Sequence, residues 1–246
     1  MGEVHISLKA EEIISFFGFS ITNSILATWL VMVMLIVVSL LVTSKLTMVP
    51  SRLQSIFEMV LGGIYDLFKT ITGEKIKKFF PLVGTLFIFI IFLNWMGLIP
   101  GVGSIGLRSV VHGKKEFIPL LRAGSADINT TLAFAIVSVV LIQFYGFTTL
   151  GKEYLGRFIN LKNPINFFVG LLEIMSEGTK VISFAFRLFG NIFAGEVLLT
   201  VVAFLMPLFA PLPFLVLELF VGFIQALVFS MLTAVFLSVA TTSHEH

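Results

Sequence analysis

The residues best suited to chemistry in this sequence lie inside a long apolar stretch near the C-terminus. Arg187 and Glu196 stand within "SFAFRLFGNIFAGEVLL", which otherwise has the composition of a membrane span. An arginine near the centre of a bilayer costs about 2.5 to 3.5 kcal/mol, and such charges usually line aqueous paths or meet opposite charges. At about 100° per residue, other polar residues fall within about 40° of Arg187 on one helical face, namely Glu173, Ser176, Lys180, Ser183 and Asn191. This stripe indicates a surface that carries or pairs charge and does not face lipid.

Two acids and an amide extend this chemistry to a second segment. Glu196 lies nine residues after Arg187 and therefore points to the opposite side of the helix. Glu218 and Gln225 are seven residues apart and share one helical face. An antiparallel return predicts that Glu218 approaches Glu196 and that Gln225 approaches Arg187. Two carboxylates placed in this way release their protons in coupled steps.

The composition indicates that these residues are positioned by membrane helices. Hydrophobic residues make up 57% of the chain, charged residues only 12%, and the mean hydropathy is +1.06, whereas soluble domains carry about 25% charged residues. The net charge of +2 gives no basic face, which argues against nucleic acid as a partner. The sequence has no cysteine, so disulfides, thiolate metal sites and cysteine nucleophiles are excluded. We expect no cofactor and no metal.

Apolar runs long enough to cross a bilayer, about 20 residues each, divide the chain. We expect one membrane domain, 1–246, with an outer segment at 1–20, spans at 21–43, 79–99 and 128–151, an outer loop at 100–127, a long tilted helix at 163–206 and a final helix at 213–241. The prolines of "MPLFAPLP" separate the last two helices into a hairpin. The first arm would be about 64 Å long as one helix, so it either breaks near Gly190 or lies steeply tilted.

The segment at 51–72 has a different pattern, that of an amphipathic helix that lies in the interface or packs on a partner. Its apolar residues recur at helical spacing: Leu53, Ile56, Phe57, Val60, Ile64, Leu67 and Phe68. The predicted fold class is therefore an all-α polytopic membrane protein, with about five membrane-embedded helices and one interfacial helix.

The distribution of Lys and Arg predicts the orientation, because cytoplasmic loops carry the excess. Nine of these residues fall on one side of the predicted membrane: Lys45, Arg52, Lys69, Lys75, Lys77, Lys78, Lys152, Arg157 and Lys162. Five fall on the other side: Lys9, Arg108, Lys114, Lys115 and Arg122. We expect the N-terminus outside and the C-terminus in the cytoplasm. The basic loop from Arg108 to Arg122 suggests no chemistry of its own.

The motif "RLFGNIFAGEVLL", with "KVISFAFR" before it and "GFIQALVFSMLTAVFLS" after it, closely resembles the family of subunit a of the F-type ATP synthase. "SADINTTLAFA" and "NWMGLIP" fit the same family, so the resemblance runs from about Pro81 to the C-terminus. It implies a non-catalytic, ion-translocating stator subunit, which contacts a rotor ring of small c-type hairpin subunits and peripheral-stalk b-type subunits. The absence of a transit peptide favours a bacterial inner membrane.

The resemblance also implies roles for individual residues. Arg187 would face the ionisable carboxylate of the rotor ring and separate two aqueous half-channels. The resemblance implies that the outer path is lined by Asn191, Glu196, Glu218 and Gln225, with Asp127 and Asn129 at its entrance. It places Lys180, Glu173 and Glu177 toward the cytoplasmic exit, with Ser183 between them and Arg187. Family members differ at the positions of Glu196 and Glu218, and in some of them His replaces one of the two acids. The choice between proton and sodium depends mainly on the rotor, which is another chain.

Other interpretations of the same residues stay open at this point. Arg187 could be a structural arginine neutralised by Glu218 within the hairpin. The chain could be a self-contained secondary transporter or a proton-pumping redox subunit, although it shows no internal repeat and no His pair for haem. A membrane scaffold would leave the polar stripe unexplained.

Overall fold

The structure is a computed structural model, and it describes residues 10–16, 19–44, 46–99, 101, 105–111, 114–158, 164–207 and 209–242. Four residues used in the sequence analysis, Lys9, Lys45, Lys162 and Asn163, lie outside these ranges, as do the side chains of Arg108, Lys114 and Lys115. Within the described ranges the α-helices are α1 Asn23–Thr43, α2 Arg52–Thr72, α3 Ile76–Met96, α4 Ile128–Leu150, α5 Lys152–Phe158, α6 Pro164–Leu205 and α7 Pro211–Ala240.

Among the described residues, five helical stretches are long and apolar enough to cross a membrane. They are α1, the stretch from α2 through α3, α4, α6 and α7. Their many exposed apolar side chains suit a surface surrounded by lipid or by partner helices. The prediction of an all-α polytopic membrane protein is confirmed.

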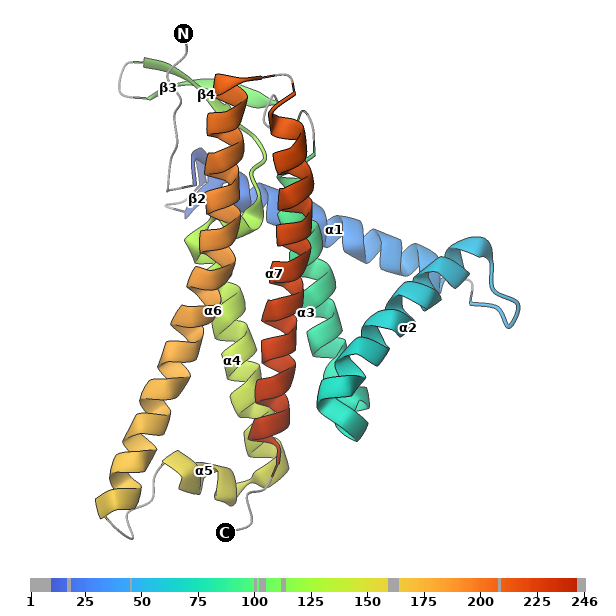
Figure 1. Cartoon of the computed structure of the whole chain (residues 1–246), viewed down its shortest axis with the longest axis vertical. Coiled ribbons are helices and arrows are strands. Elements are labelled where there is room, and N and C mark those ends of the chain that lie inside the picture. Colours follow the sequence, from blue (N-terminus) through green and yellow to red (C-terminus); the bar gives the residue numbers. More distant parts are fainter. Residues whose placement is uncertain are drawn as a thin grey trace.

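The C-terminal hairpin dominates the molecule. α6 runs for 42 residues and passes through Gly190 without a break. α6 and α7 lie side by side near the N-terminal end of the molecule and diverge toward the other end, where the short helix α5 lies beside the start of α6 (Figure 1). Pro211 and Pro213 occupy the first turn of α7, where a missing backbone N–H costs nothing.

The bundle core forms where α3 and α4 pack against α6 and α7. Aromatic side chains link the elements: the ring of Phe87 on α3 meets Phe223 on α7, and Phe184 on α6 meets Phe229 on α7. The Nζ atom of Lys75 donates hydrogen bonds to the carbonyl and hydroxyl oxygens of Thr241, at 3.0 and 3.3 Å. Because the end of a helix carries unpaired carbonyls, this contact caps α7 and fixes its end against the start of α3.

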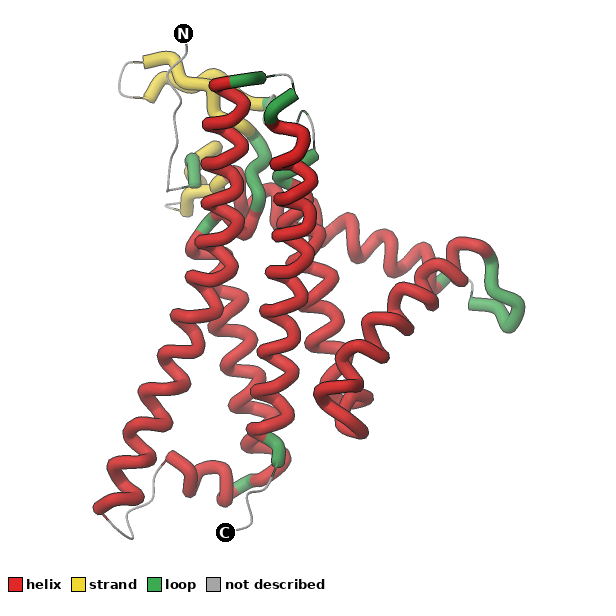
Figure 2. Tube along the Cα trace, in the orientation of Figure 1, coloured by secondary structure: helices red, strands yellow, loops and turns green. Residues whose placement is uncertain are grey.

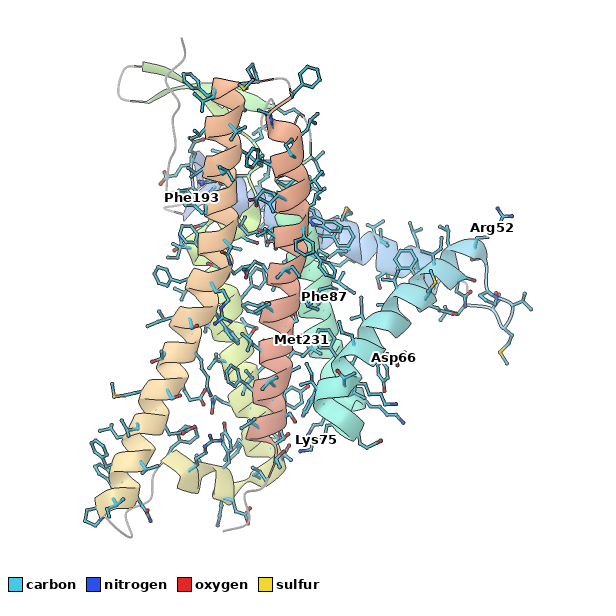
Figure 3. All side chains as sticks on the ribbon, in the orientation of Figure 1. Arg52, Asp66, Lys75, Phe87, Phe193 and Met231 are labelled. Carbon is cyan, nitrogen blue, oxygen red and sulfur yellow. The ribbon has the colours of Figure 1, made fainter. Side chains whose placement is uncertain are left out.

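The amphipathic helix α2 extends away from this core. It turns into α3 through a 3-10 helix, Gly73–Lys75, whose Gly73 has a φ of 56°, a value that favours glycine. Arg52, at the start of α2, lies far from the bundle, whereas Lys75, just after α2, lies beside the lower part of α7 (Figure 3). α1 leaves the bundle in the same direction, so α1 and α2 form an arm beside it (Figure 1).

Two β-hairpins were not predicted from the sequence. β1 Glu12–Phe16 pairs with β2 Phe19–Thr22, and β3 Gly106–Val111 pairs with β4 Lys114–Pro119, both antiparallel. Both hairpins lie toward the end of the molecule where α6 ends (Figure 2). A 3-10 helix, Gly124–Ala126, then leads the chain into α4.

Candidate functional site

A cavity of about 230 Å³ opens between the ends of α3, α6 and α7 and the segment before α4. Glu196, Glu218, Arg122 and Asn94 all line it. The structure therefore brings Glu196 and Glu218 to one cavity, although the hydrogen bonds of the described residues join neither acid to the other. This arrangement collects two carboxylates, one guanidinium and one amide in a space that is large enough for water.

Glu196 is paired with Arg122. The Nε atom of Arg122 donates to both carboxylate oxygens of Glu196 at 3.0 Å, and its guanidinium lies 5.9 Å from the centre of the Phe193 ring. The Arg122 side chain is only 8% exposed and that of Glu196 is 38% exposed. Phe193 lies in the upper half of α6 (Figure 3), so this ion pair ties the loop before α4 to the C-terminal half of α6.

Glu218 is held by tight backbone packing. It is 6% exposed, and its carboxylate lies directly against Gly195, where a Cβ atom would overlap it. Asn94 crosses from α3 to α7, donating to the Gly222 carbonyl at 2.9 Å and accepting from the Ser125 hydroxyl at 2.5 Å. These contacts fix the wall of the cavity on the side of Glu218.

Asp127 and Asn129 lie at the start of α4, beside a second cavity of about 580 Å³ that the N-terminal hairpin also lines. Asp127 is 4% exposed and caps the helix, because its Oδ1 atom accepts from the backbone N–H of Asn129 at 3.0 Å and from its side-chain amide at 3.2 Å. A structural role as N-cap is therefore built in. Asp127 is also one of the residues that line the second cavity.

Arg187 lies on the exposed face of α6, as do Ser183 and Asn191. Its Nη2 atom hydrogen-bonds to the Ser183 hydroxyl, one turn earlier, at 3.2 Å. Gln225 is half-buried on α7, and no hydrogen bond within the described residues joins it to Arg187. Glycine and alanine flank this charge on the same face, since Gly190 has no atom near its Cβ position and Ala194 is exposed.

A second polar cluster lies toward the start of α6. Glu173 pairs with Arg157 of α5 at 2.6 Å, and Glu177 pairs with Lys180 at 2.5 Å. The Nζ atom of Lys180 also lies 4.5 Å from the centre of the Phe236 ring on α7. The polar stripe predicted from helical spacing therefore divides, because these charges turn toward α5 and α7 while Arg187 stays exposed.

Arg187 separates the two clusters along α6. It lies seven residues after Lys180 and nine before Glu196, which corresponds to about 10 Å and about 14 Å along the helix axis. Within the structure, no described acidic side chain forms an ion pair with it. The chain thus presents a permanent positive charge between two polar regions, on a surface that its own helices leave open.

Sequence reasoning missed Arg122 and Asn94, which line the first cavity. Arg122 was counted with the basic loop, yet it pairs with a residue 74 positions later. The sequence signal that could have indicated it is local: Arg122 stands just before the uncharged, small residues "AGSA", a stretch that the structure buries and where a charge needs a partner. Asn94 stands in an apolar span next to Trp95, which makes it a polar residue in need of a partner.

Comparison with known proteins identifies the family of this chain. The family model described as "ATP synthase A chain" matches residues 25–238. Relatives named "ATP synthase subunit a" include those of Syntrophobacter fumaroxidans (35% identical, covering 96% of this chain and 91% of the relative), Moorella thermoacetica (33%, 92% and 93%) and Citrifermentans bemidjiense (35%, 91% and 89%). The resemblance found in the sequence is confirmed, and the chain belongs to the ATP synthase A chain family of integral membrane proteins.

Proposed function

We propose that this chain is the stationary half of a rotary proton channel, in which Arg187 separates two half-channels that open to opposite sides of the membrane. The observation that carries the proposal is the position of Arg187, exposed on α6 between the two polar clusters and bonded only within its own helix as far as the described residues show. An arginine within an apolar membrane helix lines a water-filled path or pairs with an opposite charge, and an exposed one can find that charge on another chain. A carboxylate on a rotor ring of c-type hairpin subunits meets that requirement.

Arginine suits this position because its guanidinium is effectively never deprotonated. It therefore blocks direct proton transfer between the half-channels and still pairs with a carboxylate that passes it. A ring carboxylate loses its proton to one half-channel, is stabilised by Arg187, and takes up a proton from the other half-channel before it returns to lipid. The membrane potential supplies about 2.3 kcal/mol per charge per 100 mV, and rotation is the output.

The outer half-channel is formed by the cavity of Glu196 and Glu218, with Asn191 and Gln225 on the way to Arg187. Asp127 and Asn129 lie at its entrance, beside the second cavity. Arg122 holds the Glu196 carboxylate in place, which leaves Glu218 as the acid without a cationic partner among the described ion pairs of the chain. We infer that Glu218 takes up and releases the proton, and that Glu196 orients the proton path without carrying the proton.

The packing of Glu218 on Gly195 provides a test of the outer path. Gly195→Ala is expected to slow passive proton conductance about tenfold, because the added methyl group displaces the Glu218 carboxylate. Gly178→Ala is the matched control, since a Cβ at Gly178 meets no atom within 4 Å. Conductance is measured in membranes stripped of the catalytic sector, and equal rates for the two variants would contradict this role of Glu218.

The inner half-channel contains Glu173, Glu177 and Lys180, with Ser183 between them and Arg187. It opens at the end of the molecule where α5 and the end of α7 lie (Figure 1). This end is the cytoplasmic side if the N-terminus lies outside, as the distribution of Lys and Arg predicts. We place the chain in a bacterial inner membrane, as a subunit that itself carries no catalytic site.

Two surfaces remain for partners. The small residues Gly190 and Ala194 beside Arg187 allow a ring helix to approach α6 closely. The arm of α1 and α2 exposes apolar side chains such as Leu40, Leu41 and Met59, and it suits helices of the b-type stalk subunits.

Cross-linking tests the ring contact, and the absence of native cysteine makes it clean. Asn191→Cys is expected to form a disulfide with a cysteine introduced beside the carboxylate of the ring subunit, in the complete complex. Val137→Cys, which is also exposed but lies on α4, is the control and should not react. Cross-linking of both positions to the same extent, or of Val137→Cys alone, would contradict the docking of the ring on α6.

A further inference from the structure

A buried tyrosine joins the inner cluster from α5. Its hydroxyl donates to the Oε1 atom of Gln143 on α4 at 2.6 Å, and Tyr154 is only 5% exposed. The ring fits against Gly146, where a Cβ atom would lie 2.6 Å from it, and also packs on Phe158 with 5.4 Å between ring centres. α5 is therefore positioned so that one phenol reaches the space between α4 and α6.

Two buried polar atoms near this phenol have no hydrogen-bond partner, the Nε2 atom of Gln143 and the Oε2 atom of Glu177. The other carboxylate oxygen of Glu177 is held by Lys180. Most buried polar atoms in proteins have a partner, so each exception needs an explanation. One atom is a donor and the other an acceptor, which is the combination that suits a water-filled path.

The electrostatics keep the hydroxyl protonated. Burial raises the pKa of Tyr154 above its usual value, and the negative charges of Glu177 and Glu173 raise it further, while Arg157 and the hydrogen bond with Gln143 oppose the shift. Because a free tyrosine titrates near pH 10, the phenol remains an O–H donor at neutral pH. It therefore fixes the Gln143 side chain with its oxygen toward Tyr154 and its amide nitrogen free for the path.

Resting on the function proposed above, we propose that Gln143 and Tyr154 belong to the inner half-channel, with Tyr154 as a positioning residue that orients the Gln143 amide toward the route past Glu177. The phenol does not carry the proton. The phenol holds the Gln143 amide, and the amide orients the water through which protons reach Glu177. Because Tyr154 belongs to α5, this helix lines the path.

Tyr154→Phe tests this role, because it removes the hydroxyl and keeps the ring against Gly146. In inverted membrane vesicles carrying the complete complex, we expect ATP-driven proton pumping to fall about tenfold, the equivalent of one hydrogen bond. The loss should grow as the pH on the cytoplasmic face rises, since proton entry then limits the rate. A role in packing alone would lower the rate by the same factor at every pH.

Tyr145→Phe is the matched control, because its ring packs against Phe79 on the same helix bundle and no hydrogen bond of its hydroxyl is found among the described residues. Gln143→Leu should reproduce the pH-dependent loss, and the double variant with Tyr154→Phe should be no worse than Gln143→Leu alone. All variants are checked for assembly by the amount of complex recovered. If Gln143→Leu fails to assemble, Gln143→Glu replaces it, because the carboxylate keeps an acceptor for the phenol but has no amide nitrogen.

Pumping by Tyr154→Phe within twofold of Tyr145→Phe across the pH range, or a loss independent of pH, would overturn the inference. Its failure is distinguishable from failure of the proposed function. If only the inference is wrong, the parent complex still conducts protons and substitution of Arg187 still changes that conductance.

Discussion

Arg187→Lys is expected to abolish proton-driven ATP synthesis, although it conserves the positive charge. Lysine is a compact, strongly hydrated ammonium that loses its proton when desolvated, whereas arginine stays charged. A neutral lysine leaves the ring carboxylate without its partner, and removing one partner of a buried charge pair costs about 3 to 5 kcal/mol, which corresponds to a rate loss of about a hundredfold or more. ATP synthesis in energised membranes measures the effect, with the amount of assembled complex as the reference.

Arg187→Ala is expected to do more than stop synthesis, because it removes the barrier between the half-channels. The two polar clusters lie only about 10 Å and about 14 Å from Arg187 along α6, so water that enters its place connects them. A passive proton leak should then appear in the Ala variant and be smaller in the Lys variant.

Arg52→Lys is the control for both substitutions, since Arg52 lies at the start of α2, far from the bundle (Figure 3). It should leave synthesis and leak unchanged. Normal assembly of Arg187→Ala with synthesis at the parent rate would refute the assignment of Arg187, whatever the behaviour of the other residues.

The apolar runs and their helical periodicity predicted most of the long helices, because membrane spans must be continuous, apolar and about 20 residues long. The same periodicity put Ser183, Arg187 and Asn191 on one face, and all three are exposed together on α6. The prolines of "MPLFAPLP", at the turn from α6 into the first turn of α7, marked the hairpin for a local reason that needs no tertiary information. Those parts of the prediction depend on the chain within a few turns of each residue.

The features that the sequence did not indicate depend on contacts between distant elements. Lys180 shares the phase of Arg187, yet it turns to Glu177 and Phe236 because α7 packs on that side. The pairing of Arg122 with Glu196 requires the loop before α4 to fold back over α6, which no helical wheel can show. The second hairpin had a local signal that was not used, since "VVHGKK" places two β-branched residues shortly before a glycine, a residue typical of hairpin connections.

The contact between Arg122 and Glu196 changes what is expected of the two outer acids. From sequence alone, coupling was expected between Glu196 and Glu218. The structure instead gives Glu196 a guanidinium partner with two hydrogen bonds and packs Glu218 against Gly195. We therefore expect the stronger coupling in the outer half-channel to join Arg122 to Glu196.

A double-mutant cycle on passive proton conductance measures this coupling. Glu196→Gln should slow conductance strongly, because the buried Arg122 guanidinium loses a carboxylate that neutralises it. Arg122→Gln combined with Glu196→Gln should recover part of the loss, with an interaction free energy of about 0.5 to 3 kcal/mol. The equivalent cycle for Glu196→Gln and Glu218→Gln should give a smaller value, since no hydrogen bond within the described residues joins the two acids.

Glu218→Gln alone discriminates between the roles of the two acids. If Glu218 passes the proton, this variant should lose conductance to a degree that no change at Arg122 restores, because an amide cannot take up and release the proton. Recovery of Glu218→Gln by Arg122→Gln would mean that Glu196 carries the proton. Additive losses for Arg122 and Glu196 would mean that their ion pair has no orienting role.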